Sequence, residues 1–138
     1  MEFIDTNVLL YAYDTSEQLR HEPAHQLVAR LGRDREAAIS VQVLQEFYVN
    51  ATRKIAAPLS PDEARTRLRL FSRWSVHSPL AADVLAATAL QEEHQLSFWD
   101  AMIVRSAAQL GCERLWSEDL NDGQIISGVR ITNPFTDR

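Results

Sequence analysis

Four acidic residues, whose side chains are well suited to binding metal ions, lie where apolar segments of the chain begin or end. They are Asp5, Glu46, Asp100 and Asp119. Carboxylates that a fold brings together repel one another unless a cation lies between them. Mg²⁺ and Mn²⁺ are divalent cations that prefer oxygen ligands of this kind. The four acids therefore predict a Mg²⁺ or Mn²⁺ site, provided that the fold brings them together.

Two of these acids also have an ordinary structural interpretation. Asp100 follows Ser97 by three residues, which is the spacing of a helix-capping pair. Glu46 shares one face of a predicted helix with Gln42 and Asn50, and a polar face of this kind usually faces solvent. Judged singly, each of the two acids fits these explanations better than a metal site.

The other two acids differ in the strength of their individual evidence. Asp119 precedes the turn sequence Asn121-Asp122-Gly123, so a loop acid is its default interpretation. Asp5 has the strongest individual case, because an acid that ends a buried strand must be solvated or bound. The prediction of a site therefore depends on the four acids as a set.

Short strands and helices alternate along the chain, which predicts an α/β fold with a central parallel sheet and helices on both faces. Asn7 is predicted to cap the first helix, and Pro23 suits the first turn of the second. The predicted strands are residues 3–4, 37–40, 75–77, 114–116 and 129–131, and the predicted helices are residues 8–13, 23–31, 41–54, 61–74, 79–93 and 98–110.

This fold gives the acids a place to meet, because ligands of open parallel sheets bind beyond the carboxyl ends of the strands. Asp5 directly follows the first strand, and Asp119 follows the strand that ends near Ser117. Asp100 falls in the first turn of its helix, where the helix dipole favours negative charge. Glu46 lies about 9 Å along its helix from the same edge of the sheet. All four side chains are therefore within reach of one crevice.

Size and composition indicate one globular domain, residues 1–138, in the cytoplasm. A chain of 138 residues with 46% hydrophobic content can bury a substantial core. No segment approaches the roughly 18 apolar residues that span a membrane, and the N-terminus lacks the basic start of a secretory signal. Cys112 is the only cysteine, which excludes an internal disulfide and fits a reducing compartment.

Four short motifs resemble the conserved motifs of PIN-domain nucleases, and they occur in the same order with familiar spacing. The chain is also similar to VapC-type toxins of that family in its small size and in its closing Asn133-Pro134-Phe135. The four motifs are Phe3-Ile4-Asp5-Thr6-Asn7-Val8-Leu9, Ser40-Val41-Gln42-Val43-Leu44-Gln45-Glu46-Phe47, Phe98-Trp99-Asp100-Ala101 and Ser117-Glu118-Asp119-Leu120.

The resemblance implies a PIN-like three-layer fold and assigns a role to each matching position. It implies that Asp5, Glu46, Asp100 and Asp119 are the catalytic acids and hold one or two Mg²⁺ or Mn²⁺ ions. Many family members carry a further acid two residues after the fourth, where this chain has Asn121, with Asp122 beside it. A second metal ion is therefore less well supported than the first. The supporting residues that the resemblance implies are Thr6, Asn7, Ser117, Asn121 and Asp122.

The resemblance also implies an activity and partners. The expected activity is metal-dependent endonucleolytic hydrolysis of RNA, which leaves 5′-phosphate and 3′-hydroxyl ends. The expected substrate is RNA in single-stranded or loop regions, where bases can be splayed out. The expected partners are a cognate antitoxin protein and a second copy of the chain.

Arginines on one predicted helix are candidates for contact with RNA. Arg65, Arg69 and Arg73 recur every four residues and would form one stripe. The formal net charge of −5 argues against bulk adhesion to nucleic acid, yet arginine suits phosphate contact well. A solvated helix face explains the stripe equally well, and the resemblance offers antitoxin contact as a third explanation.

One competing motif is His21-Glu22-Pro23-Ala24-His25, which matches the H-E-x-x-H pattern of zinc proteases. That chemistry needs both histidines on one face of a continuous helix. Pro23 is expected to prevent this by starting the helix after His21. A zinc site is therefore not predicted here.

Two other functions remain open on the sequence alone. One is a PIN-fold nuclease that processes RNA without a toxin role. The other is a non-catalytic module that binds metal or RNA. Four convergent carboxylates argue against the second, because binding alone does not require them.

Overall fold

The computed structural model describes residues 1–136, which form six strands and six helices within that range. No helix in this range is long and apolar enough to cross a membrane. The strands are β1 (Glu2–Ile4), β2 (Ala37–Ser40), β3 (Ser75–His77), β4 (Arg114–Trp116), β5 (Ile125–Ile126) and β6 (Val129–Thr132). The helices are α1 (Thr6–Tyr11), α2 (His21–Arg33), α3 (Val41–Arg53), α4 (Pro61–Phe71), α5 (Ala81–His94) and α6 (Phe98–Gln109).

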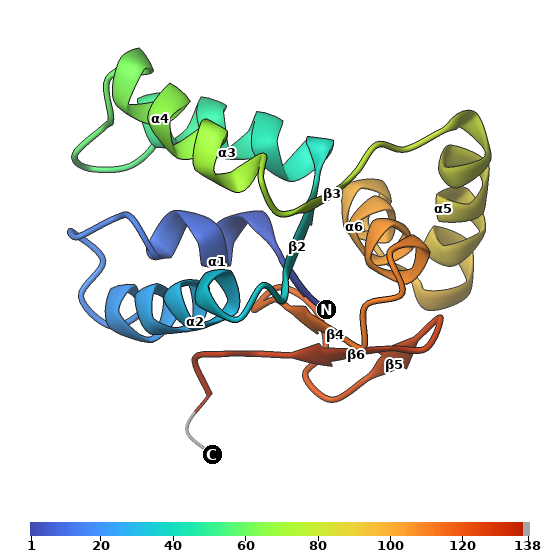
Figure 1. Cartoon of the computed structure of the whole chain (residues 1–138). Coiled ribbons are helices and arrows are strands. Elements are labelled where there is room, and N and C mark those ends of the chain that lie inside the picture. The colour runs from blue at the N-terminus through green and yellow to red at the C-terminus, as the bar shows by residue number, and fades with distance from the viewer. Residues whose placement is uncertain (137–138) are drawn as a thin grey trace.

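The strands form one mostly parallel sheet in the order β3-β2-β1-β4-β6-β5. The pairs β1–β2, β2–β3, β1–β4 and β4–β6 are parallel, and only the edge pair β5–β6 is antiparallel. Helices α1 to α4 lie on one side of the sheet, and α5 and α6 lie on the other (Figure 1). The predicted three-layer α/β class is therefore confirmed.

The central strands of the sheet are buried on both faces, as their apolar residues require. Phe3, Ile4, Ile39, Leu115 and Ile131 are each at most 1% exposed. Parallel strands covered by helices on both sides read as continuous apolar runs rather than alternating ones. Burying each such side chain contributes about 1.5–3 kcal/mol, so this core fixes where the strands end.

The first helix begins two residues earlier than predicted, and its cap is Asp5 rather than Asn7. Asp5 has an extended backbone (φ −69°, ψ 155°), and its Oδ1 accepts a hydrogen bond from the Thr6 N–H at 2.7 Å. The helix follows β1 without a linker, so the acid that ends the strand is also the residue that caps the helix.

The second helix begins at His21, so the expectation that Pro23 separates the two histidines is wrong. Pro23 is the third helical residue, where a missing N–H costs no intrahelical hydrogen bond. The rings of His21 and His25 stack with centroids 5.6 Å apart. Their Nδ1 atoms lie 2.8 Å and 3.3 Å from the carbonyl oxygens of Tyr11 and Ala12, so the pair joins α2 to the end of α1.

The fourth helix ends at Phe71, three residues before its predicted end. Ser72 is its C-terminal cap, and the Ser72 hydroxyl donates to the Leu68 carbonyl at 2.6 Å. Arg73 therefore lies beyond the helix, and the predicted stripe of three arginines is interrupted. Trp74 folds back onto Phe71, with ring centroids 4.9 Å apart, as the chain turns into β3.

Candidate active site

The candidate site lies where the direction of chain connection reverses in the sheet. From β1 the chain moves outward to β2 and β3, and it then crosses to β4 on the other side of β1. Ligands of open parallel sheets bind at such switch points, beyond the carboxyl ends of the strands. Asp5 follows β1 and Ser117 follows β4, and the Asp5 N–H donates to the Trp116 carbonyl at 3.0 Å.

Asp5 is the buried centre of this region, with 6% of its surface exposed. Its Oδ1 caps α1, and its Oδ2 accepts a hydrogen bond from the Ser117 hydroxyl at 2.8 Å. Burial raises the pKa of Asp5 to about 7, although the two hydrogen bonds oppose the shift, and the negative charges of Asp119 and Asp100 raise it further.

Ser117 links two of the acids through a single hydroxyl group. It is fully buried, and while its Oγ donates to Asp5 it accepts a hydrogen bond from the Asp119 N–H at 3.2 Å. The loop after β4 is therefore tied to the end of β1. This contact accounts for a small hydroxyl residue at the position that the sequence motif singles out.

Thr6 and Asn7 orient Glu46 and Asp119 from the first turn of α1. The Thr6 hydroxyl donates to Glu46 Oε1 at 2.7 Å. The Asn7 amide donates to Asp119 Oδ2 at 3.1 Å. These side chains reach residues 40 and 112 positions away in sequence, so they fix the geometry between elements rather than within one.

Asp100 is both a helix-terminus residue and a member of the site. Its N–H donates to the Ser97 hydroxyl at 3.1 Å, as the capping interpretation requires. Partial burial raises the pKa of Asp100, the Ser97 hydrogen bond lowers it, and the charge of Asp119 raises it. The capping interpretation and the site interpretation therefore apply to the same residue.

The four acids line one pocket of about 100 Å³. The polar face of α3 that carries Glu46 turns toward this pocket, so its neighbours Gln42 and Asn50 line it as well. Gln42 and Asn50 each lie four residues from Glu46, so the sequence places all three on one helix face. The sequence predicts that this face meets solvent, whereas in the structure it lines the pocket. The remaining lining residues are Thr6, Asn7, Trp99 and Ile103.

The donor atoms of this pocket fit a hard divalent cation. Carboxylate, amide and hydroxyl oxygens are the ligands of Mg²⁺ and Mn²⁺, and among residues 1–136 no Lys or Arg lines the pocket to balance the acids. Within residues 1–136, however, no three His, Cys, Asp or Glu side chains are close enough to share one ion. Mg²⁺ is commonly held by one or two carboxylates and several waters, so three direct acidic ligands are not required.

The other predicted site residues lie outside this pocket. The Asn121 amide donates to Gln124 Oε1 at 3.3 Å, and Asp122 Oδ1 accepts from the Asn133 N–H at 2.9 Å. Arg65 pairs with Asp62 on the surface of α4. Arg69 and Arg73 are exposed. The pocket therefore unites seven of the predicted residues, if Ser117 is included through its bond to Asp5.

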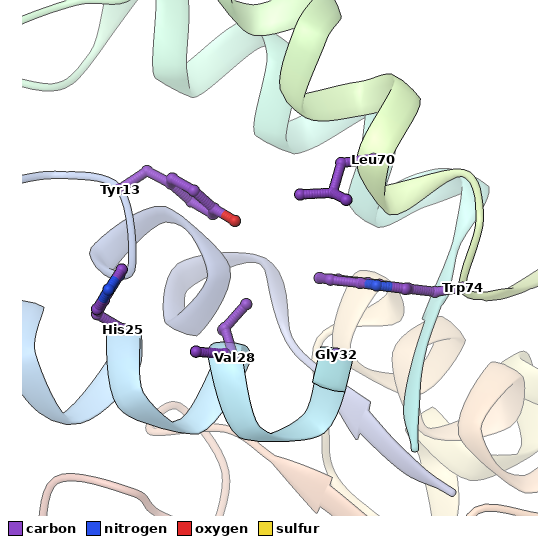
Figure 2. A pocket seen from close by; sticks show the side chains of 7 residues that line it. Tyr13, His25, Val28, Gly32, Leu70 and Trp74 are labelled. Atoms are coloured by element: carbon purple, nitrogen blue, oxygen red, sulfur yellow. The ribbon is translucent and has the colours of Figure 1, made fainter. Parts of the chain in front are cut away.

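A larger cavity of about 220 Å³ lies between α2 and the end of α4 (Figure 2). Tyr13, Val28, Leu70 and Trp74 line it, and Figure 2 shows the Tyr13 hydroxyl directed into it. No carboxylate of the described residues lines this cavity. The candidate site is therefore distinguished by its acids and not by the size of its pocket.

Comparison with protein families matches residues 3–121 to the PIN domain. The match covers most of the chain and includes all four acids, so the protein belongs to the PIN domain family. A comparison with curated protein sequences finds no match.

Several solved structures share the fold. One is a toxin–antitoxin complex from Klebsiella pneumoniae, with 24% identity, a TM-score of 0.72 and coverage of 98% of both chains. Another is Mycobacterium tuberculosis VapC20, described as a Sarcin–Ricin loop cleaving toxin, with 21% identity, a TM-score of 0.69 and coverage of 86% of this chain and 92% of that one. A third is DNA-bound VapBC from Salmonella typhimurium, with 18% identity, a TM-score of 0.68 and coverage of 96% and 97%.

Proposed function

We propose that this chain is a divalent-metal-dependent endoribonuclease and the toxin of a VapBC-type toxin–antitoxin pair. The observation that carries the proposal is the convergence of Asp5, Glu46, Asp100 and Asp119 from four separate segments on one pocket. Membership of the PIN domain family supports a nuclease. Toxins and toxin–antitoxin complexes among the structures that share the fold support the toxin role.

In this proposal the four acids bind Mg²⁺ or Mn²⁺ at the switch point of the sheet, partly through bound water, because no three of the described acidic side chains are close enough to share one ion directly. The bound ion supplies Lewis acidity toward a phosphodiester and stabilises the charge that develops on its oxygens. Ser117 fixes the Asp5 carboxylate, Thr6 fixes that of Glu46, and Asn7 fixes that of Asp119. These hydrogen bonds hold the oxygens in place before substrate arrives, which reduces the cost of organising the site during reaction.

The wider proposal concerns the form of the protein in the cell. Residues 1–138 act as a single PIN domain in the cytoplasm, pair with a cognate antitoxin and form a homodimer. Asn121 and Asp122 remain predicted supporting residues. Arg65, Arg69 and Arg73 remain candidates for contact with RNA or with the antitoxin.

The test is cleavage of total cellular RNA by the purified protein with Mg²⁺, with Mn²⁺ and with EDTA, in parallel with Asp100→Asn. We expect fragments with 5′-phosphate ends that require the metal, and a loss of at least ~100-fold in Asp100→Asn. Glu63→Gln is the matched control, because Glu63 also stands three residues after a capping serine but on exposed α4. Cleavage that persists in EDTA, or equally in Asp100→Asn, would remove metal and acid from the mechanism. No cleavage by folded protein with metal present would favour a binding module.

A further inference from the structure

Trp99 differs from the other two tryptophans because it is left open to solvent at the acidic pocket. It is 62% exposed and lines the pocket with the four acids. Trp74 packs on Phe71, and the Trp116 indole donates to Glu2 at 2.9 Å. Exposing a large aromatic ring gives up the stabilisation of burial, and its place among the acids of the pocket makes it a candidate for contact with a ligand.

The position of Trp99 is fixed by its surroundings. It is the second residue of α6, which Ser97 caps, and its carbonyl accepts a hydrogen bond from the Gln42 amide at 3.3 Å. The Phe98 ring meets the indole edge-on, with centroids 5.1 Å apart and planes at 76°. The backbone that carries the indole is therefore anchored to α3 across the pocket.

The charge of the pocket limits how a nucleic acid strand can bind beside it. Within the described part of the chain, the pocket is lined by four acidic side chains and by no lysine or arginine. The chain as a whole carries a formal net charge of −5. Side-chain cations therefore give a phosphate backbone no attraction at this point. Stacking of a base on an aromatic ring does not depend on charge, and every base has a face that can take part.

We propose that Trp99 is a substrate-binding residue that stacks on one unpaired nucleobase next to the bond that is cut. The proposal rests on the nuclease function proposed above. Stacking requires a base whose face is free, so Trp99 favours single-stranded or loop RNA over duplex RNA. It also places part of the affinity for substrate on a neutral side chain adjacent to Asp100, where no Lys or Arg among the described residues lines the pocket to bind phosphate.

The test compares Trp99→Leu, which keeps an apolar side chain, with Trp99→Phe, which keeps an aromatic face. For cleavage of a short single-stranded RNA with Mg²⁺, we expect Trp99→Leu to raise KM by about tenfold with kcat changed by less than about threefold. Trp99→Phe should recover most of the loss. Trp74→Phe is the control, because Trp74 lies at the apolar cavity and away from the acids.

A second readout does not depend on cleavage. An eight-nucleotide single-stranded RNA added in EDTA should quench tryptophan fluorescence of the wild type and of Trp74→Phe, and should not do so in Trp99→Leu. Quenching without cleavage in the wild type would support stacking and contradict the nuclease. Cleavage by Trp99→Leu with the KM of the wild type would contradict the stacking proposal and leave the nuclease proposal standing. A wild-type oligomer that dissociates in Trp99→Leu, by gel filtration, would assign Trp99 to a protein interface and overturn the proposal.

Discussion

Two buried aspartates, Asp5 and Asp83, accept backbone N–H groups at the starts of helices but have opposite surroundings. Asp5 is 6% exposed and Asp83 is 2% exposed. Asp5 accepts the Thr6 N–H at the start of α1, and Asp83 accepts the Leu80 N–H at the start of α5, at 2.7 and 2.8 Å. Local structure alone would therefore assign both residues to helix capping.

Their partners separate the two residues. The hydrogen bond from the Leu80 N–H has the largest effect on the pKa of Asp83. Asp83 Oδ1 also accepts from Gln109 Nε2 at 3.0 Å and from Arg105 Nε at 2.9 Å. Together these bonds lower the pKa of Asp83 to about 2. Burial, opposed by only two hydrogen bonds and aided by neighbouring acids, raises the pKa of Asp5 to about 7. The fold supplies a counter-charge to the buried aspartate that holds α5 against α6. No cation is among the described groups that shift the pKa of Asp5, the aspartate at the switch point. A buried acid whose pKa is raised in this way is typical of a functional site.

Asp5→Asn should produce the largest change in activity and no loss of stability. Asparagine keeps the shape of the side chain and an oxygen for the Thr6 N–H, but it removes a buried charge near Asp100 and Asp119. We expect RNA cleavage to fall by at least ~100-fold. The urea midpoint should be equal to or above that of the wild type, because repulsion among the acids is reduced. Cleavage within twofold of the wild type would exclude Asp5 from the site.

Asp83→Asn should lower stability and leave activity unchanged, which is the reverse of Asp5→Asn. It leaves the Arg105 guanidinium, which is 28% exposed, without its carboxylate. Breaking a buried ion pair from one side is strongly destabilising, so we expect the melting temperature to fall by on the order of 5–10 °C. Cleavage per folded molecule, measured well below the transition, should be unchanged. A melting temperature equal to that of the wild type would mean that the Asp83 contacts are not structural.

The pH dependence of stability should distinguish the wild type from Asp83→Asn. The pKa of Asp83 is lowered from 3.8 to about 2 on folding, so the unfolded chain binds more protons in that interval. The contribution of Asp83 is therefore complete above about pH 4 and is lost as pH falls toward 2. Urea midpoints of the two proteins, measured from pH 5 to 2, should converge. A constant difference would show that the stabilisation does not come from the charge of Asp83.

The sheet could be predicted where apolar runs are bounded by polar residues, and the predictions failed where tertiary contacts set a boundary. Strands β2, β3 and β4 lie where the sequence placed them. The sequence predicts the second helix but places its start two residues too late, because proline suits the first turn of a helix and His21 precedes it. The sequence does not predict strand β5, because two residues are too few to show an alternating pattern. The strand depends on a turn at Ser127 and Gly128, both with positive φ (51° and 80°).

The residues of the site also divide into those that local sequence signals predict and those that only tertiary packing brings to the pocket. The sequence identified the four acids and Thr6, Asn7 and Ser117, because each stands at an element boundary or in a family-like motif. It did not identify Gln42, Asn50 or Trp99 as pocket residues. The face of α3 that turns to the pocket is set by packing of the adjacent face into the core, through Val43, Phe47 and Ala51. That orientation is a property of the packed layers and not of the helix sequence.

Thr6→Val should separate orientation of an acid from stability. Valine has the shape of threonine but cannot donate to Glu46, so the carboxylate loses the hydrogen bond that holds it at 2.7 Å. We expect cleavage to fall by about tenfold, which corresponds to about 1.4 kcal/mol, a typical value for one hydrogen bond to a charged group. Thr52→Val is the matched control, because the Thr52 hydroxyl donates only to carbonyls within α3. Equal rates in the two variants would mean that Glu46 needs no orientation.

Ser106→Ala should give the smallest effect and should confine it to stability. The Ser106 hydroxyl lies 2.8 Å from His77 Nδ1, and His77 Nε2 lies 3.5 Å from Asp83 Oδ2. This order of serine, histidine and aspartate is like that of a hydrolytic triad, but Ser106 is 2% exposed and no substrate can reach it. Loss of one buried hydrogen bond should reduce the free energy of unfolding by about 1 kcal/mol. Cleavage should be unchanged, and a fall in cleavage without a fall in stability would give the Asp83 region a catalytic role and remove its contrast with Asp5.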